Sequence, residues 1–229
     1  MVMQTEGEKK TVINRIDHTA LQYSFLASAL ACGNPKGPYD EGLLNRGPKY
    51  VFLPPDTSIL DEKYYKIHNK KKLISMVYSH KKQLTGHKMR FAIAEKLIPK
   101  INFSDKIDLF GSGTGVYLED KADACLDYMF QIAIENSKVK NYYGDKILDC
   151  FVTGCIPIYW GCPNISDFFD KRGIMVFETA NELKDILLSI NEEKYISMLQ
   201  YAKSNFEKAL KYQQIDDYLF STIKEKLNI

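Results

Sequence analysis

Residues 131–160 read QIAIENSKVKNYYGDKILDCFVTGCIPIYW. Two short apolar runs, QIAIEN at 131–136 and IPIYW at 156–160, flank GDKILDCFV, a segment from residue 144 whose apolar residues recur at helical spacing. A strand, a helix and a strand in this order predict a right-handed β-α-β unit of a parallel sheet. This unit decides the fold class.

Similar patterns extend on both sides of this unit. Further strands are expected near 73–79, 106–111 and 173–177. Further helices are expected from residues 87, 121 and 181, the last capped by Thr179 or Asn181, and over 192–212 and 215–226. Near-continuous apolar strands are typical of a sheet covered on both faces. The sequence therefore predicts a doubly wound α/β domain over 73–229, preceded by a short segment, 1–72, with ligands bound at the carboxyl ends of the strands.

Composition narrows the class of protein. The 229 residues include 31 basic and 29 acidic side chains, a net charge of +2, so no global field favours nucleic acid. The five cysteines form no Cys-x-x-Cys pair and are interpreted as buried thiols in a reducing compartment, which predicts a cytoplasmic protein, peripheral association with a membrane left open. The apolar run at 20–32 is interpreted as a core-facing helix rather than a signal segment. It is too short to span a membrane, which takes about 20 residues.

Several catalytic patterns are absent from the sequence. The glycines of 111–115 lack the third glycine of a dinucleotide-binding fingerprint and favour a loop. No two aspartates are spaced as Asp-x-Asp, the four histidines show no zinc spacing, and no Gly-x-Ser-x-Gly elbow occurs. No metal site is therefore predicted.

The segment from Glu135 to Asn164 has the features of a diphosphate site. Backbone N–H groups at a helix start attract phosphate, and Lys146 adds a positive charge there. Asp145 can accept hydrogen bonds from ribose hydroxyls, Tyr142 offers an aromatic face, and Arg90 on the first helix can bind phosphate in a bidentate manner. Spacing alone leaves the simpler alternative open, in which the two cations lie on helix surfaces and Tyr142 packs in its loop.

Three segments are similar to a known family. YMFQIAIENS at 128–137, NYYGDK at 141–146 and GCIPIYWGCP at 154–163 resemble, without a gap, the donor-binding signature of glycosyltransferase family 10, the α-1,3/α-1,4-fucosyltransferases. A Ser79-to-Arg90 region is similar as well, so the likeness covers about 70–225.

The resemblance implies a fold, a reaction and a set of site residues. The fold is the Rossmann-like donor half of a two-domain GT-B glycosyltransferase, with 1–72 the remnant of an acceptor domain. The reaction is an inverting transfer of L-fucose from GDP-fucose, a co-substrate rather than a tightly bound cofactor, to a glycan hydroxyl. The implied donor-binding residues are Arg90, Asn136, Tyr142, Asp145 and Lys146.

The chain also departs from the family pattern. Asp145 stands where the family has glutamate, Gly144 where it has threonine, and Asn141 where it has aspartate. The catalytic carboxylate of the family lies in the acceptor domain, for which Asp40 and Glu41 are the only substitutes suggested, with a surface turn as the alternative. A non-catalytic module that binds a nucleotide sugar or glycan without a general base, and a purely structural α/β domain, are the competing hypotheses.

Overall fold

The computed structural model describes residues 60–211. Five strands form one parallel sheet in the order β2-β1-β3-β4-β5. Their bounds are β1 (Lys72–Val77), β2 (Ile107–Phe110), β3 (Tyr128–Ile134), β4 (Ile156–Trp160) and β5 (Met175–Val176). The register places Met76 of β1 beside both Leu109 of β2 and Ile132 of β3. The predicted parallel α/β sheet is confirmed.

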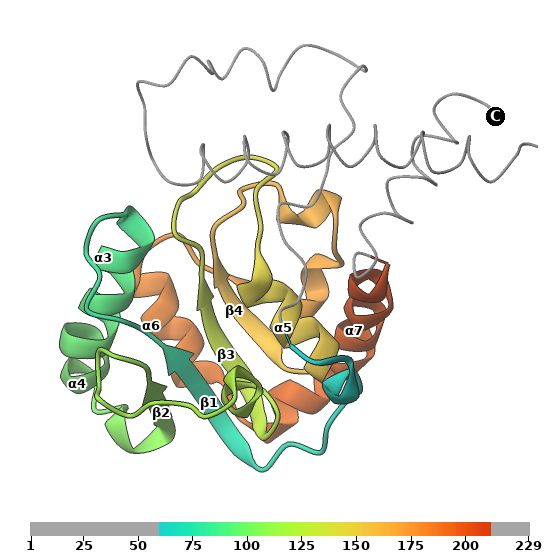
Figure 1. Ribbon diagram of the computed structural model, residues 1–229, viewed down its shortest axis with the longest axis horizontal. Helices are drawn as coiled ribbons and strands as arrows, with labels where there is room; N and C mark the ends of the chain where they lie inside the picture. The colour runs from blue at the N-terminus through green and yellow to red at the C-terminus, as the bar shows by residue number, and fades with distance from the viewer. Residues whose placement is uncertain (1–59, 212–229) are drawn as a thin grey trace, which may run out of the picture.

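Helices follow most of the strands (Figure 1). The longer ones are α3 (Thr85–Ala92), which continues through a π-helical turn, η3 (Ile93–Leu97), into α4 (Ile98–Lys100), then α5 (Asp145–Thr153), α6 (Ala180–Ser189) and α7 (Glu192–Leu210). Short 3₁₀ turns are η2 (Glu62–Tyr64), η4 (Ser104–Lys106), η5 (Lys121–Ala124), η6 (Ile165–Asp167) and η7 (Lys171–Gly173). Thr179 caps α6 and forms a capping box with Glu182, as one of the two predicted caps. The predicted helices at 20–31 and 215–226 lie outside the described residues.

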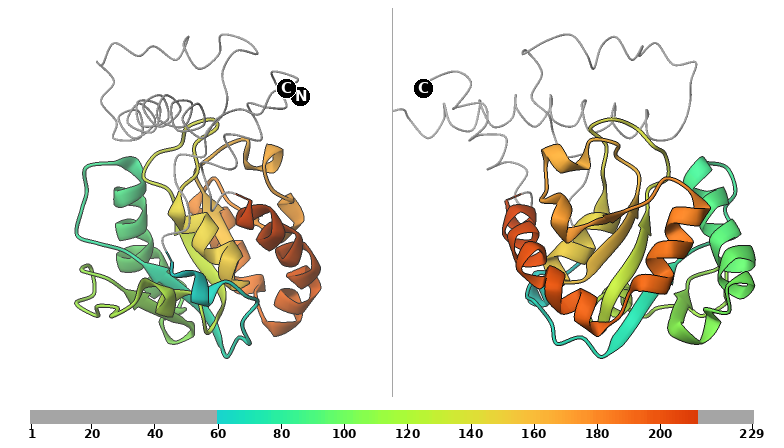
Figure 2. Two further views of the ribbon diagram at one scale, coloured as in Figure 1. Left: turned by 45° about the vertical axis from the view of Figure 1, so that its right-hand side comes forward. Right: turned by 180° about the vertical axis from the view of Figure 1, so that it is seen from behind.

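Both faces of the sheet are covered, as a doubly wound fold requires. Alternate residues of β3 and β4, such as Ile132 and Ile158, pack in one core with Leu183 of α6. Tyr159 and Ile147 belong to a second core on the other face. The two cores correspond to the layers seen in Figure 2, where the view from behind brings α6 forward and α5 lies beyond the sheet.

One predicted helix is wrong and one strand is displaced. The segment from residue 121 forms only η5, a 3₁₀ turn whose first residues are capped by the Asp120 side chain, which accepts a hydrogen bond from Ala122 N. Tyr128 then pairs with Lys72 in the sheet, so β3 begins three residues before the predicted start and ends at Ile134. Strand pairing here overrides the local helical pattern. The glycines of 111–115 form a turn closed by a bridge between Gly111 and Val116, in line with the predicted loop.

The strand order fixes where a ligand site is expected. β1 is flanked by β2 and β3, and the connection that leaves β1 covers the face opposite to that covered by the connection leaving β3. A doubly wound sheet opens a crevice at such a switch point, at the carboxyl ends of the two strands. The division at residue 72 stays a prediction, because residues 1–59 lie outside the described part.

Two of the expectations from composition can be compared with residues 60–211. The four cysteines in this part, Cys125, Cys150, Cys155 and Cys162, are all buried free thiols. No helix in the same residues has both the length and the apolar character needed to cross a bilayer.

Candidate functional site

A pocket of about 290 Å³ lies at this switch point. Its walls come from the ends of β1, β2 and β3 and from α3, η5 and α5. The polar and charged residues that line it are Ser79, Arg90, Ser112, Lys121, Gln131, Asp145, Lys146 and Asp149.

The pocket exists because the connection from β2 to β3 contains only a short 3₁₀ turn and no full helix. A right-handed crossover from β2 to β3 passes over the face of β1 on the side of α5, where a full helix would fill the space. Here only η5 lies there, held to the sheet by hydrogen bonds from the Ser75 hydroxyl and from Gln131 Nε2 (3.1 Å) to the Ala124 carbonyl. The space beside η5 is lined by apolar strand residues such as Ile132 and Ile134 together with the polar and charged side chains named above.

Arg90 is fixed at the carboxyl end of β3. The Gly86 N–H donates to the Asn136 carbonyl at 2.9 Å, and a Cβ on Gly86 would lie 1.8 Å from the Glu135 carbonyl oxygen, so only glycine allows this approach of α3. One turn later, the buried Arg90 donates to the Ile134 carbonyl and, at 2.8 Å, to Asn136 Oδ1. Burial lowers the pKa of Arg90, although the nearby Glu135 and Asp145 raise it.

Glu135 positions the start of α5. Its side chain is fully buried; Oε1 accepts the Gly144 N–H at 2.9 Å and Oε2 lies 3.4 Å from Lys146 Nζ. Burial raises the pKa of Glu135, and Lys146 and the Gly144 N–H only partly oppose this. A Cβ on Gly161 would lie 2.5 Å from Glu135 Cγ, so the loop after β4 closes over this carboxylate.

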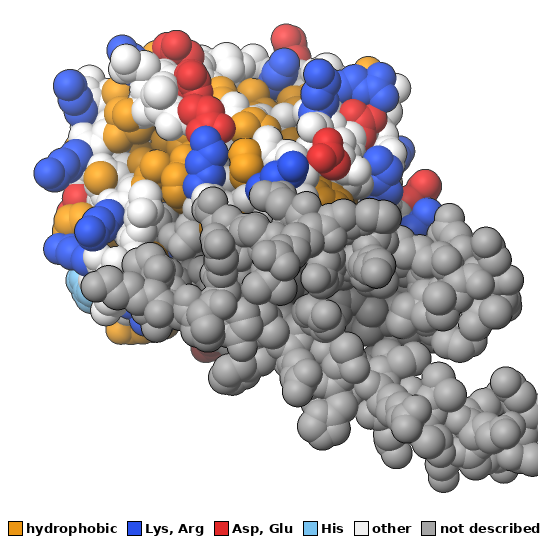
Figure 3. Space-filling model, turned by 90° about the horizontal axis from the view of Figure 1, so that it is seen from above, with side chains coloured by type: hydrophobic (Ala, Val, Ile, Leu, Met, Phe, Trp, Pro, Cys, Tyr) orange, Lys and Arg blue, Asp and Glu red, His pale blue; other side chains and the backbone are white. Residues whose placement is uncertain are grey.

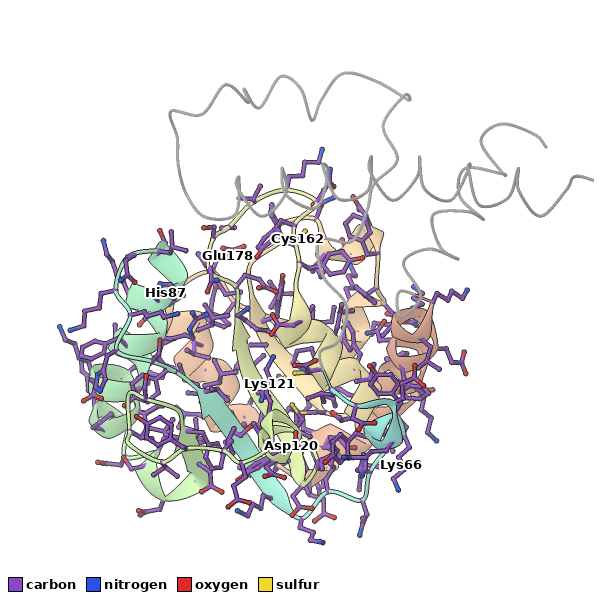
Figure 4. The ribbon with its side chains drawn as sticks, in the orientation of Figure 1. Lys66, His87, Asp120, Lys121, Cys162 and Glu178 are labelled. Carbon is purple, nitrogen blue, oxygen red and sulfur yellow. The ribbon has the colours of Figure 1, made fainter. Side chains whose placement is uncertain are left out.

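Two lysines share the carboxylate of Asp145. Lys146 Nζ lies 3.0 Å from Asp145 Oδ1, and Lys121 forms an ion pair with Asp145 Oδ2. Lys121 Nζ also lies 2.6 Å from Oδ2 of Asp149. In Figure 4, Lys121 lies near the centre of the molecule, between Asp120 toward one edge and Cys162 toward the other.

The electrostatics of the pocket are nearly balanced. Burial raises the pKa of Asp145, but Lys146 and Lys121 outweigh it and lower the value to about 2. Burial lowers the pKa of Lys121, and Asp149 and Asp145 reverse this to a net increase. Three cationic side chains, Arg90, Lys121 and Lys146, thus face three carboxylates, Glu135, Asp145 and Asp149. On the face seen in Figure 3, basic and acidic side chains likewise occur together around an apolar area, so anion recognition depends on local geometry.

The structure brings most of the predicted site residues together. Arg90, Asp145 and Lys146 line one pocket, and Asn136 joins them through Arg90. Tyr142 does not line this pocket. It lies in the loop before α5, and its backbone is close to the Cys162 thiol. Asp40 and Glu41 lie outside the described residues.

Sequence reasoning missed Lys121 and Asp149. Asp149 carried a signal, because it follows Asp145 by four positions and therefore shares its face of α5. Lys121 carried none, since its place in the pocket depends on how the connection crosses the sheet. Within residues 60–211, no group of three or more His, Cys, Asp and Glu side chains is arranged to hold a metal ion.

A parallel sheet with a charged pocket at its switch point defines a ligand-binding domain of the doubly wound class. Residues 67–224 match the model of glycosyltransferase family 10 (fucosyltransferase), C-terminal part, and the chain belongs to this family.

Curated relatives support the same family. An α-(1,3)-fucosyltransferase FucT of Helicobacter pylori is 29% identical over 82 residues, 36% of this chain and 16% of the relative. An α-(1,3)-fucosyltransferase B of Drosophila melanogaster is 36% identical over 81 residues, 33% of this chain and 18% of the relative. The matches thus span less than a fifth of these relatives.

Solved structures give weaker likenesses. An α1,3-fucosyltransferase solved with GDP-fucose is 22% identical, with a TM-score of 0.46, over 64% of this chain and 48% of that one. An α1,3-fucosyltransferase solved with GDP is 23% identical, with a TM-score of 0.46, over 65% of this chain and 48% of that one.

Proposed function

We propose that the pocket binds the GDP part of a GDP-sugar, with GDP-fucose as the leading candidate. We further propose that the protein transfers the sugar to a glycan hydroxyl with inversion. One observation carries the proposal: Arg90 and Lys146, from separate helices, line one pocket at the switch point of a family 10 chain. Both side chains therefore border the same open space.

The diphosphate is assigned to Arg90 and Lys146. Arg90 is held in place by the Ile134 carbonyl and Asn136, so it requires little ordering when a ligand arrives. Lys146 lies in the first turn of α5, whose N-cap residue Gly144 provides no capping side chain. Helix dipole and ammonium charge therefore favour an anion at the same place.

The remaining roles follow the family pattern. Asp145 accepts hydrogen bonds from the ribose, and Asn136 lines the donor site while holding Arg90. A role for Tyr142 at the donor stays a prediction, because this residue lies outside the pocket lining. Inverting transfer requires a general base that deprotonates the acceptor hydroxyl. No residue is assigned this role; Asp40 and Glu41 stay the two candidates, with a surface turn as the alternative.

Titration calorimetry with GDP and UDP tests donor binding. We expect UDP to bind at least about 10-fold more weakly than GDP, and Arg90→Ala or Lys146→Ala to weaken GDP binding by about 10-fold or more. Lys72→Ala is the matched control, since Lys72 also forms an ion pair with an aspartate but lies at the amino end of β1. Equal affinity for the two nucleotides, or no binding of either, would contradict the proposal.

A transfer assay distinguishes an enzyme from a binding module. Release of GDP from GDP-fucose that increases with added glycan acceptor is the expected result for the full 229-residue chain. GDP affinity without any turnover would favour the alternative, a module that binds the nucleotide sugar and lacks the general base.

A further inference from the structure

Lys121 is more accessible to a ligand than either cation assigned above. Its side chain is 36% exposed, against 25% for Lys146, and Arg90 is buried. It comes from η5, which precedes the three signature segments at 128–163. Nothing in the family resemblance assigns it a role.

Each lysine of the pocket forms an ion pair with one carboxylate that the other lysine does not contact. Lys121 Nζ lies 2.6 Å from Asp149 Oδ2, and Lys146 Nζ lies 3.4 Å from Glu135 Oε2. Asp149 is 1% exposed and Glu135 is fully buried, so neither carboxylate can leave its lysine for water.

Asp145 is the partner that the two lysines have in common. It forms ion pairs with both, its side chain is 18% exposed, and it lines the pocket. An ammonium group has three N–H donors and no acceptor. If Asp145 turned away, each lysine would keep its buried carboxylate and present at least one N–H to whatever replaced Asp145.

We propose that Lys121 is a third diphosphate-binding residue and that the Asp145 carboxylate occupies, in the unliganded protein, the place of a phosphate group. This inference rests on the proposed function, since it concerns the same pocket. Binding of the nucleotide exchanges Asp145 for phosphate oxygens at both lysines and releases Asp145 toward the ribose. No bond to carbon or phosphorus changes in this exchange.

Inorganic pyrophosphate is the probe, because it has the phosphates without the ribose. By titration calorimetry on the full chain, Lys121→Gln is expected to weaken pyrophosphate binding by about 10-fold, and Lys121→Arg to retain most of it. Asp145→Asn is expected to strengthen pyrophosphate binding several-fold, because a competing anion is removed. A merely structural network predicts the opposite sign for Asp145→Asn, and Lys72→Gln should leave binding unchanged.

Two results overturn the inference. One is a Lys121→Gln variant that binds pyrophosphate and GDP as the unmodified chain does, and the other is an Asp145→Asn variant that binds pyrophosphate more weakly. If Lys121→Gln does not fold, Lys121→Gln with Asp149→Asn removes both charges and is expected to show the same loss. If the unmodified chain binds neither GDP nor pyrophosphate, the donor-site proposal itself fails, which is a distinguishable outcome.

Discussion

Two lysine–aspartate clusters lie at opposite ends of the same strands. At the amino end, Lys72 Nζ lies 2.8 Å from Asp108 Oδ2, with side-chain exposures of 54% and 47%. The Tyr128 hydroxyl donates to the same oxygen. At the carboxyl end, Lys121 pairs with Asp145 and with Asp149, which is almost fully buried.

The difference between the two clusters is the cost of removing charge from water. An exposed ion pair contributes about 0–1 kcal/mol, whereas breaking a buried pair costs about 3–5 kcal/mol because a charge is left without compensation. The cluster at the carboxyl end therefore adds little net stability to the sheet. Its buried carboxylates instead keep the lysine side chains in fixed positions beside the pocket. Comparing matched substitutions at the two ends tests this distinction.

The largest effect is expected at Lys121. Lys121→Met leaves Asp149 buried beside hydrocarbon and should lower the free energy of unfolding by about 3 kcal/mol. Lys72→Met at the amino end should lower it by less than about 1 kcal/mol. Urea unfolding at pH 7 measures both, and equal losses would show that burial does not separate the two clusters.

Much of the fold could be predicted because local patterns agree with the sheet. The segment 131–160 covers most of the β3-α5-β4 unit, and its near-continuous apolar runs agree with strands that are buried on both faces. The predicted helix from residue 121 failed for a non-local reason. Its residues alone suit a helix, but Tyr128 is needed beside Lys72 in the sheet, and this pairing is visible only once the strand order is known.

The site residues also fall into those that the sequence could predict and those that it could not. Arg90, Asn136, Asp145 and Lys146 belong to segments that resemble the family signature, and the structure places them at or beside one pocket. Lys121 comes from the connection that replaces a helix, so its position depends on the whole topology rather than on neighbouring residues. Asn141, which stands where the family has aspartate, accepts a hydrogen bond from Asn164 Nδ2 at 2.7 Å and donates its backbone N–H to Asn164 Oδ1 at 2.9 Å. An aspartate could form both bonds, so they give this substitution no structural explanation.

A smaller effect is expected from the pH dependence of Asp145. Burial raises its pKa, but Lys146 and Lys121 bring it down to about 2, below the ordinary value of 3.8. A carboxylate whose pKa is lower in the folded state stabilises the fold at pH values above its unfolded-state pKa. This contribution, about 2 kcal/mol, is lost as pH falls from about 4 to about 2. In Asp145→Asn, urea unfolding should show a lower stability at pH 7 and a flatter decline over this range.

Asp108→Asn is the control for that pH profile. Lys72 lowers the pKa of Asp108 as well, but the side chain is nearly half exposed, so screening by solvent reduces its contribution. Its profile should stay closer to that of the unmodified chain. A larger flattening in Asp108→Asn than in Asp145→Asn would reverse the proposed ranking of the two ends.

The smallest effect is expected at the two carboxylates that flank β3. Asp127 precedes the strand, is 46% exposed and pairs with Lys71 at 3.5 Å, whereas Glu135 follows it and is fully buried. Burial raises the pKa of Glu135, so the folded state holds this proton more tightly than the unfolded state does, and stability is lost as pH rises above the ordinary value of 4.5. Glu135→Gln keeps an oxygen for the Gly144 N–H and should therefore raise the free energy of unfolding at pH 7 by up to about 1 kcal/mol.

The gain in Glu135→Gln should vanish below pH 4.5, and the control Asp127→Asn should change stability at pH 7 by less than about 0.5 kcal/mol. A loss of stability in Glu135→Gln at pH 7 would mean that the ion pair with Lys146 outweighs burial, and that this carboxylate stabilises the fold as well as the pocket.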